Sequence, residues 1–160
     1  VARARPDVRL LVVGKGLRGE EERLPQVLTA RGLGHTLAYA GWVEPNALPA
    51  HFAAAQVAIF PYADTLINRC KCSVKLTELL AQGVPVVASD VGQNGEYIRN
   101  GESGLLVPAG DPAGFARAVL RLLEQPEWAR RLGEAARQRM REHFDWGHLA
   151  GRAEAAYRSG

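Results

Sequence analysis

The chain has 160 residues, of which 47% are hydrophobic and 23% charged, a composition typical of one globular domain. Its formal net charge of +3 is small, and the arginines of the C-terminal third stand beside glutamates. This pattern indicates salt-bridged helix faces, so nucleic acid is not an expected partner. The longest apolar runs fall far short of the roughly 20 residues that cross a bilayer, which excludes a membrane-spanning helix.

The cysteines and histidines indicate neither a disulfide nor a metal site. Cys70 and Cys72 are the only cysteines, and residues two apart rarely reach the geometry of an unstrained disulfide. We therefore expect reduced thiols and a cytoplasmic protein. The four histidines have no zinc-like spacing to each other or to the cysteines, and we assign no metal.

Strand and helix patterns alternate from the start of the chain. A strand is predicted at residues 8–13, a helix at 20–31 and a short strand at 37–40. A helix that begins near Pro45 and a strand at 57–60 follow. This alternation is typical of a parallel α/β sheet.

The second half continues the alternation and then becomes wholly helical. The expected elements are a helix at 73–82, strands at 84–89 and 105–107, and helices at 112–124, at 126–143 and from 146 onward. The strands are nearly continuous in Val, Ile, Leu and Ala, which indicates that helices cover both faces of the sheet. The predicted fold class is α/β, a Rossmann-like doubly wound parallel sheet of five strands with C-terminal helices.

The loop after the first strand is glycine-rich. It reads Gly14-Lys15-Gly16-Leu17-Arg18-Gly19 and matches the glycine fingerprint of dinucleotide-binding domains. That fingerprint also needs an acidic residue at the end of the second strand, which instead ends Tyr39-Ala40-Gly41-Trp42, with Glu44 beyond. A nucleotide contact and a ligand-free turn both stay open for this loop, and NAD(P) is one alternative ligand.

A polar loop leads into the helix predicted at 73–82. Ser73 suits the N-cap position, which would leave the amides of Val74, Lys75 and Leu76 free to bind an anion such as a diphosphate. The Lys75 side chain would contact that phosphate or point to water. Glu78, about one turn deeper, can accept hydrogen bonds from the vicinal hydroxyls of a ribose. Simple capping and decoration of an amphipathic helix would explain Ser73 and Glu78 equally well.

Short motifs run through nearly the whole chain in a fixed order. Residues 78–88 read Glu-Leu-Leu-Ala-Gln-Gly-Val-Pro-Val-Val-Ala, and Gly92, Glu96, Asn100-Gly101 and Gly-Leu-Leu-Val at 104–107 follow. Earlier come Val13-Gly14, the Ala-Gly-Trp-Val of residues 40–43 and Pro61. In this combination they resemble the C-terminal domain of family 4 (group 1) retaining glycosyltransferases, which have the GT-B architecture.

The resemblance implies a role for each matching position. Glu78 corresponds to the ribose-binding glutamate, and Ser73 and Val74 to the residues whose amides bind the donor diphosphate, with Lys75 beside them. The segments that flank the nucleobase contribute Gly14, Gly16, Gly41, Trp42 and Val43. For Trp42, packing near the base and ordinary core packing stay equally open.

The donor-sugar region departs from the family pattern. It comprises Cys70, Lys71 and Cys72, and Cys70 occupies the place of the family's first glutamate, which contacts the donor sugar. A branch of the family with Lys at the position of Lys75 and without that glutamate resembles this sequence. The identity of the donor sugar therefore stays open.

The resemblance also implies what the intact enzyme does. It is expected to transfer a sugar from a nucleoside-diphosphate sugar to an acceptor with retention of configuration, without a metal or other cofactor. Residues 1–160 form the donor-binding domain, whereas the acceptor site belongs to an N-terminal domain absent from this chain. The family's first strand, with the Arg and Lys that follow it, is expected before Val1. No catalytic residue is expected here, and the fragment alone should be inactive.

Partners and alternatives complete the sequence-based interpretation. The expected partners are a nucleotide sugar and the missing N-terminal domain, while peripheral membrane association of the intact enzyme stays open. One alternative is an NAD(P)-binding Rossmann domain built on residues 14–19. The other is a non-catalytic binding module that retains the same fold.

Overall fold

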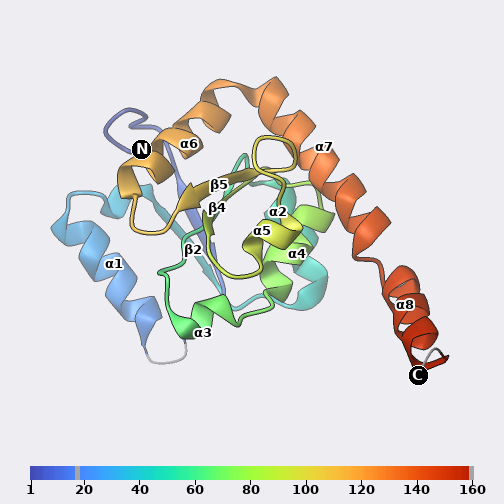
Figure 1. Cartoon of the computed structure of the whole chain (residues 1–160). Coiled ribbons are helices and arrows are strands. Elements are labelled where there is room, and N and C mark those ends of the chain that lie inside the picture. Colours follow the sequence, from blue (N-terminus) through green and yellow to red (C-terminus); the bar gives the residue numbers. More distant parts are fainter. Residues whose placement is uncertain (17–18, 159–160) are drawn as a thin grey trace. The chain divides into compact units, whose positions relative to one another are not determined.

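A computed structural model describes residues 1–16 and 19–158 of the chain. It has two compact units, Val1–Ala55 and Gln56–Gly160, each of which contains a parallel sheet flanked by helices (Figure 1). The five strands expected from the sequence are all present. They confirm the predicted α/β, Rossmann-like fold class.

The first unit contains a two-stranded sheet. Strand β1 (Leu10–Val13) pairs in parallel with β2 (Leu37–Gly41), and a register shift after Val12 places Val13 opposite Gly41. The remaining elements of this unit are α1 (Glu20–Ala30), the 3₁₀ turns η1 (Gly34–Thr36) and η2 (Pro45–Ala47), and α2 (Leu48–Ala53). Three glutamates in the first turn of α1 complement the positive end of its dipole.

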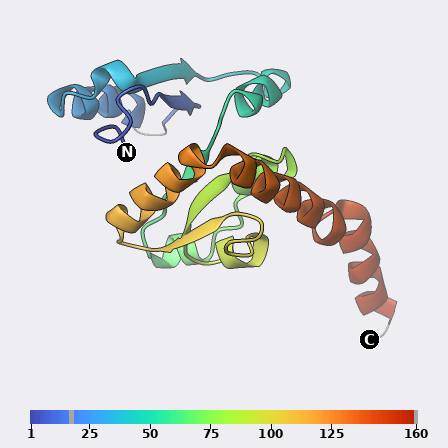
Figure 2. The same cartoon turned by 90° about the horizontal axis from the view of Figure 1, so that it is seen from above.

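The second unit contains a three-stranded sheet with β4 in its centre. Strand β4 (Val86–Asp90) pairs in parallel with β3 (Ala58–Phe60) on one side and with β5 (Leu105–Pro108) on the other. The helices are α3 (Leu66–Arg69), α4 (Val74–Ala81), α5 (Asn94–Tyr97), α6 (Pro112–Glu124), α7 (Pro126–His143) and α8 (Trp146–Arg158). Helix α6 packs on β4 and β5 (Figure 2).

The hydrophobic core of the second unit lies where α4, β4 and α7 meet. Leu76 and Leu80 of α4 and Val86 of β4 are fully buried, and Ala136 and Met140 of α7 pack in the same cluster. Burial of these side chains is the main stabilising contribution to this unit, at about 1.5–3 kcal/mol for each large aliphatic side chain. The core therefore fixes helix α4, which carries most of the predicted site.

Local sequence signals explain where the C-terminal helices begin. The Asp111 carboxylate accepts a 2.7 Å hydrogen bond from the Gly114 amide, and Pro112 and Pro126 stand at the first positions of α6 and α7. These starts were predicted. Helix α8 extends beyond the end of α7 and has no buried residue (Figures 1 and 2).

The structure differs from the sequence prediction in how far helices cover the sheet faces. The continuous apolar strands predicted that helices cover both faces. Full coverage of both sheet faces is found only for β4, where residues 86–89 are buried. Leu11, Tyr39 and Ile59 are 38–43% exposed, because few helices pack on the short outer strands of each unit.

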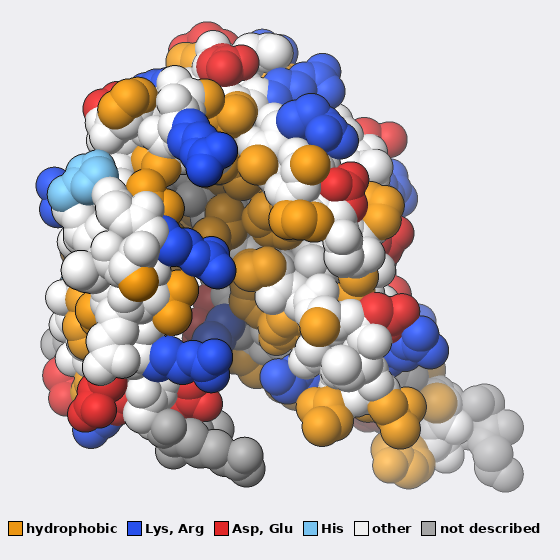
Figure 3. Space-filling view, turned by 90° about the vertical axis from the view of Figure 1, so that its left-hand side faces the viewer, with side chains coloured by type: hydrophobic (Ala, Val, Ile, Leu, Met, Phe, Trp, Pro, Cys, Tyr) orange, Lys and Arg blue, Asp and Glu red, His pale blue; other side chains and the backbone are white. Residues whose placement is uncertain are grey.

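Charged residues pair along the helices as predicted. Arg130 lies between Glu127 and Glu134 on α7, and Arg158 pairs with Glu154 on α8. On the face drawn in Figure 3, Lys and Arg side chains are mixed with acidic and hydrophobic ones. Exposed pairs of this kind contribute only about 0–1 kcal/mol each. Within residues 1–16 and 19–158, no helix is both long and apolar enough to cross a membrane.

Candidate functional site

The two predicted base-flanking segments meet at the carboxyl ends of β1 and β2. The Gly14 amide donates a 2.7 Å hydrogen bond to the Gly41 carbonyl, and the Tyr39 hydroxyl donates a 3.0 Å bond to the Gly14 carbonyl. Gly14 is thus held on both its donor and its acceptor side. The sequence placed Gly14 and Gly41 near one ligand, and the structure brings them into direct contact.

Trp42 follows Gly41 and projects into solvent. Its side chain is 72% exposed, so the alternative that Trp42 packs in the core is wrong for this structure. Val43, the next residue, is half-buried. An exposed indole beside a glycine turn can stack on a planar ligand.

The glycine-rich loop lies against the acidic first turn of α1. A side-chain carbon placed on Gly16 would collide with the carboxylates of Glu20 and Glu21, and one buried oxygen of Glu21 has no hydrogen-bond partner among residues 1–16 and 19–158. A dinucleotide domain holds its pyrophosphate at this helix N-terminus, where two nearby carboxylates would repel it. Leu17 and Arg18 of the fingerprint lie outside the described residues.

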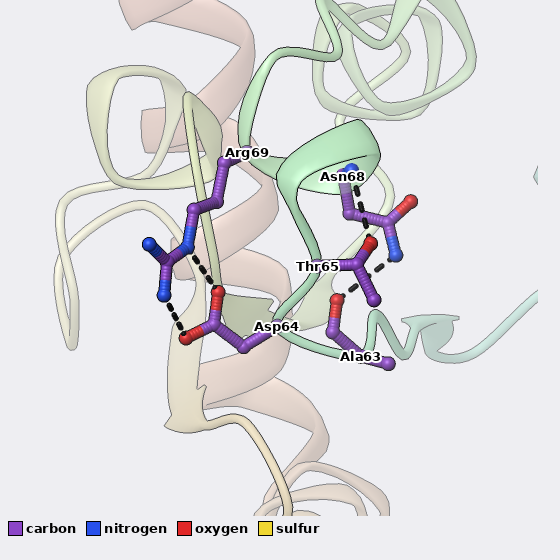
Figure 4. A network of polar contacts seen from close by, with 5 residues as sticks. All are labelled: Ala63, Asp64, Thr65, Asn68 and Arg69. Carbon is purple, nitrogen blue, oxygen red and sulfur yellow. Dashed lines mark hydrogen bonds and ion pairs between the residues drawn. The ribbon is translucent and has the colours of Figure 1, made fainter.

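A network of polar contacts stabilises the loop after β3 (Figure 4). The Asn68 side chain donates a 2.9 Å hydrogen bond to the Ala63 carbonyl, while the Asn68 amide donates to Thr65 Oγ1 at 3.2 Å. Arg69 forms two hydrogen bonds to the Asp64 carboxylate, at 2.5 and 2.8 Å. This guanidinium lowers the pKa of Asp64 below its ordinary value. The network fixes the chain just before the predicted donor-sugar region.

The N-terminus of α4 has the geometry predicted from the sequence. Ser73 is buried, and its hydroxyl accepts a 3.4 Å hydrogen bond from the Leu76 amide. Among the described residues we find no hydrogen-bond partner for the amides of Val74 and Lys75. Such first-turn amides lie at the positive end of the helix dipole and favour an anion. The prediction that Ser73 caps this helix is confirmed. The prediction that the Leu76 amide is free is wrong, because this amide donates to both the hydroxyl and the carbonyl of Ser73.

Two side chains of α4 are available to a ligand. Lys75 and Glu78 are both exposed, and neither has an ion-pair partner in the part of the chain that the structure describes. Val74, on the first turn, is 64% exposed. The second unit therefore presents free amides, an ammonium group and a carboxylate along a single helix.

The predicted donor-sugar region is the short connection between α3 and α4. Cys70 and Cys72 form no disulfide with each other and are both exposed. The Lys71 ammonium lies 5.2 Å from the centroid of the Tyr62 ring, close enough for a cation–π contact. The Cys72 sulfur lies 2.9 Å from the hydroxyl of Tyr97, a residue that the sequence analysis had not singled out.

Tyr97 is connected to several parts of the second unit. Tyr97 is only 7% exposed, and its ring packs edge-on against the ring of Phe144, with the two centroids 5.1 Å apart. Its backbone carbonyl accepts a 3.0 Å hydrogen bond from the Arg139 side chain. Burial, and then the hydrogen bond with Cys72, raises the pKa of Tyr97 to about 12. No sequence signal could have paired Tyr97 with Cys72, because no periodicity links them.

Neither the surface hollows nor the acidic, His and Cys side chains of the described residues point to a further site. One surface hollow of the described chain is lined by Val1, Arg31 and Leu33, another lies along α7, and neither of these contains a predicted site residue. Within residues 1–16 and 19–158, no group of three or more His, Cys, Asp and Glu side chains could hold a metal ion.

Comparison with known proteins identifies the family. The family model described as "Glycosyl transferases group 1" matches residues 1–125. The chain belongs to this family. Among curated relatives, a phosphatidyl-myo-inositol mannosyltransferase of Mycobacterium leprae is 35% identical over 151 residues. The match covers 94% of this chain and 38% of that relative, so the chain spans well under half the relative's length.

Solved structures of glycosyltransferases share the fold. Sucrose-phosphate synthase from Thermosynechococcus elongatus aligns with a TM-score of 0.84 and 30% identity, over 98% of this chain and 39% of that chain. Anabaena HepE, solved in complex with UDP, aligns with a TM-score of 0.80 and 22% identity, over 99% of this chain and 43% of that one. The group 1 glycosyltransferase resemblance predicted from the sequence motifs is thus confirmed.

Proposed function

We propose that residues 1–160 are the C-terminal, donor-binding domain of a retaining glycosyltransferase. The intact enzyme transfers a sugar from a nucleoside-diphosphate sugar to an acceptor, and an N-terminal domain supplies the acceptor site. The family match over residues 1–125 supports the reaction class. The fraction of the mannosyltransferase that the chain covers, 38%, supports the assignment to one domain of a larger protein.

The observation that carries the proposal is the N-terminus of α4. Ser73 caps the helix, the amides of Val74 and Lys75 have no partner among the described residues, and Glu78 projects from the next turn. In our proposal the two amides and the Lys75 ammonium bind the diphosphate. Glu78 accepts hydrogen bonds from both ribose hydroxyls, since a carboxylate has two acceptor oxygens.

The chain contributes to the reaction by electrostatics. When the bond between sugar and diphosphate breaks, negative charge accumulates on the leaving diphosphate. Fixed amide dipoles at the start of α4, together with Lys75, stabilise that charge more in the transition state than in the ground state. The proposal needs no metal or other cofactor, and it assigns no catalytic residue to this chain.

In this proposal the nucleobase and the donor sugar are bound by further residues of the chain. Gly14, Gly16, Gly41, Trp42 and Val43 flank the nucleobase, and the exposed indole of Trp42 packs on it. The donor sugar is contacted by Cys70, Lys71 and Cys72. Cys70 occupies the place of the family's first glutamate. We place the intact enzyme in the cytoplasm, in keeping with the free thiols, and its peripheral membrane association belongs to this proposal.

Calorimetric titration with UDP, GDP, ADP and NAD tests the proposal. We expect binding of one nucleoside diphosphate and none of NAD, and UDP is the first choice because HepE was solved with it. Binding of NAD alone would instead support the dinucleotide alternative, which the carboxylates beside Gly16 disfavour. Binding of none of the four, by this chain and by the full-length protein alike, would support the non-catalytic module.

Glu78→Ala tests the ribose contact. We expect the nucleotide dissociation constant to rise about tenfold or more, while the melting temperature stays within about 2 °C because the side chain is exposed. The matched control is Glu124→Ala, which removes another exposed helix glutamate and should leave nucleotide affinity unchanged. A large stability loss with unchanged affinity would reject the role of Glu78.

A further inference from the structure

The connection between α3 and α4 depends on contacts from elsewhere in the second unit. Residues 70–73 lie between two helices, and the Cys70 and Lys71 amides close the end of α3. The side chains of Cys70 and Cys72 are exposed, so burial of these thiols adds little to hold this segment in one conformation. Yet Ser73, at the end of this connection, and Val74, the first residue of α4, must be held precisely if the first amides of α4 are to bind a diphosphate.

The segment around α5 supports this connection at two points. A side-chain carbon on Gly92 would lie 2.6 Å from the Arg69 carbonyl oxygen, so the two backbones are in direct contact there. The Tyr97 hydroxyl lies 2.9 Å from the Cys72 sulfur, and either atom can donate the hydrogen bond. The first contact supports the end of α3, and the second reaches the residue just before the N-cap of α4.

Tyr97 is itself held firmly by α7. The Arg139 guanidinium donates a 2.7 Å hydrogen bond to the Glu96 carbonyl and a 3.0 Å bond to the Tyr97 carbonyl. The same guanidinium lies 5.6 Å from the centroid of the Phe144 ring, against which the Tyr97 ring packs edge-on. The hydroxyl of Tyr97 therefore extends from a fixed, buried ring toward an exposed loop.

We propose that Tyr97 is a positioning residue whose hydroxyl holds Cys72, and through Cys72 the loop that presents the first amides of α4 to the donor. The inference rests on the proposed function, because it concerns the diphosphate end of that site. Tyr97 does not touch the ligand in this proposal. It restricts the loop before the diphosphate binds, so the loop loses less conformational entropy on binding, and this preorganisation raises the affinity.

The test measures UDP affinity and melting temperature for four variants of the chain. Tyr97→Phe keeps the buried ring and removes the hydroxyl, and we expect UDP to bind about threefold to tenfold more weakly. Cys72→Ala should weaken binding equally, whereas Cys72→Ser, which keeps a hydrogen-bonding group, should restore most of the affinity. The double variant Tyr97→Phe with Cys72→Ala should bind UDP no more weakly than Tyr97→Phe alone, because both changes remove the contact between Tyr97 and Cys72 and only Tyr97→Phe also removes the 3.5 Å hydrogen bond from the Tyr97 hydroxyl to Gln93.

A second readout does not depend on nucleotide. Alkylation by iodoacetamide, followed by mass spectrometry, reports how readily Cys72 reacts relative to Cys70 in the same chain. Losing the Tyr97 hydroxyl frees Cys72, so Tyr97→Phe should raise Cys72 alkylation severalfold and leave Cys70 unchanged. Tyr157→Phe, at a tyrosine that is 89% exposed, is the matched control and should change neither readout.

The outcomes separate the inference from the function on which it rests. If the wild-type chain binds UDP and Tyr97→Phe binds it equally well, the positioning role of Tyr97 is wrong and the donor site stands. Additive losses in the double variant would likewise overturn the inference. If the wild-type and full-length proteins bind no nucleoside diphosphate, the proposed function fails and the inference falls with it.

Discussion

The Gly14 amide and the Gly41 carbonyl are joined by a hydrogen bond of 2.7 Å. The bond links the turn after β1 to the end of β2, and both glycines have backbone conformations that side chains rarely adopt, with φ of 125° at Gly14 and 68° at Gly41. The Tyr39 hydroxyl completes the arrangement by donating to the Gly14 carbonyl. The edge of the first unit that carries Trp42 is thus built on backbone geometry available mainly to glycine.

Substitution of Gly41 should destabilise the first unit by backbone strain alone. Open space surrounds the position that a side-chain carbon would occupy, so no collision contributes. We expect Gly41→Ala to lower the free energy of unfolding by about 1–2 kcal/mol. Gly41→Asn should lose less, because asparagine tolerates the left-handed region better. Urea denaturation measures both, and equal losses for Ala and Asn would contradict this explanation.

Trp42 should become less accessible when nucleotide binds. A variant with Trp128 and Trp146 replaced by Phe leaves Trp42 as the only source of tryptophan fluorescence. In the free protein this 72% exposed indole should be quenched strongly by acrylamide. We expect saturating UDP to reduce the quenching constant about twofold or more, because stacking on a base covers one face of the ring. An unchanged constant, with UDP bound by calorimetry, would place the base elsewhere.

The sequence predicted those features that local signals determine. Asp111 with Pro112 marks the start of α6, Pro126 marks that of α7, and Ser73 marks that of α4. Each signal acts within one helical turn, so no knowledge of the rest of the fold is needed. The family motifs added the identity of the family, which the comparisons confirm, and roles for Glu78 and its neighbours, which stay predictions.

Features that depend on distant contacts were not predicted. Helix α5 has only four residues, too few for a periodic pattern, and Arg139 of α7 holds its last carbonyls. The contact between Tyr97 and Cys72 joins this short helix to a loop to which the sequence does not relate it. The burial of the outer strands was also overestimated, since continuous apolar runs identify strands without specifying how many helices pack on them, and Leu11 and Ile59 are exposed.

Alkaline pH should reveal the environment of Tyr97. Its pKa is raised to about 12 in the folded chain, whereas an unfolded tyrosine titrates near its ordinary value of 10. The folded state thus favours the neutral hydroxyl. The contribution of this preference to the free energy of unfolding is fully present below about pH 10 and is lost as the pH rises toward 12. Urea denaturation between pH 9 and 12 should show an extra loss of up to about 3 kcal/mol in the wild type. Tyr97→Phe should lack this extra loss. If the free energy of unfolding of the two proteins changed with pH in parallel, the raised pKa of Tyr97 would be contradicted.

Two N-caps should differ in their contribution to stability. The Asp111 carboxylate accepts a 2.7 Å hydrogen bond and places a negative charge at the start of α6, whereas the Ser73 hydroxyl accepts a longer bond of 3.4 Å. We expect Asp111→Ala to cost about 1–2 kcal/mol and Ser73→Ala about 0.5–1 kcal/mol, measured by urea denaturation. Asp111→Asn, which keeps the cap without the charge, should cost less than Asp111→Ala. The reverse order of the two Ala variants would contradict the assignment.

Gly133 of α7 lies directly against the turn that follows α4. A side-chain carbon at this position would collide with the Gly83 carbonyl oxygen, just beyond the end of α4. Replacing an exposed glycine within a helix by alanine normally stabilises a protein by about 1 kcal/mol. Here the collision reverses the sign, and we expect Gly133→Ala to destabilise the chain by about 1–3 kcal/mol.

The matched control for Gly133 is Gly151→Ala on α8, where open space surrounds the added carbon. It should leave the stability of the core unchanged or raise it slightly, as alanine favours the helix. Thermal unfolding of both variants checks the pair. Since α4 carries the proposed diphosphate amides, Gly133→Ala should also weaken UDP binding, while Gly151→Ala should not. A stabilised Gly133→Ala variant would mean that α7 can move away from α4 at no cost, contrary to the close packing seen between them.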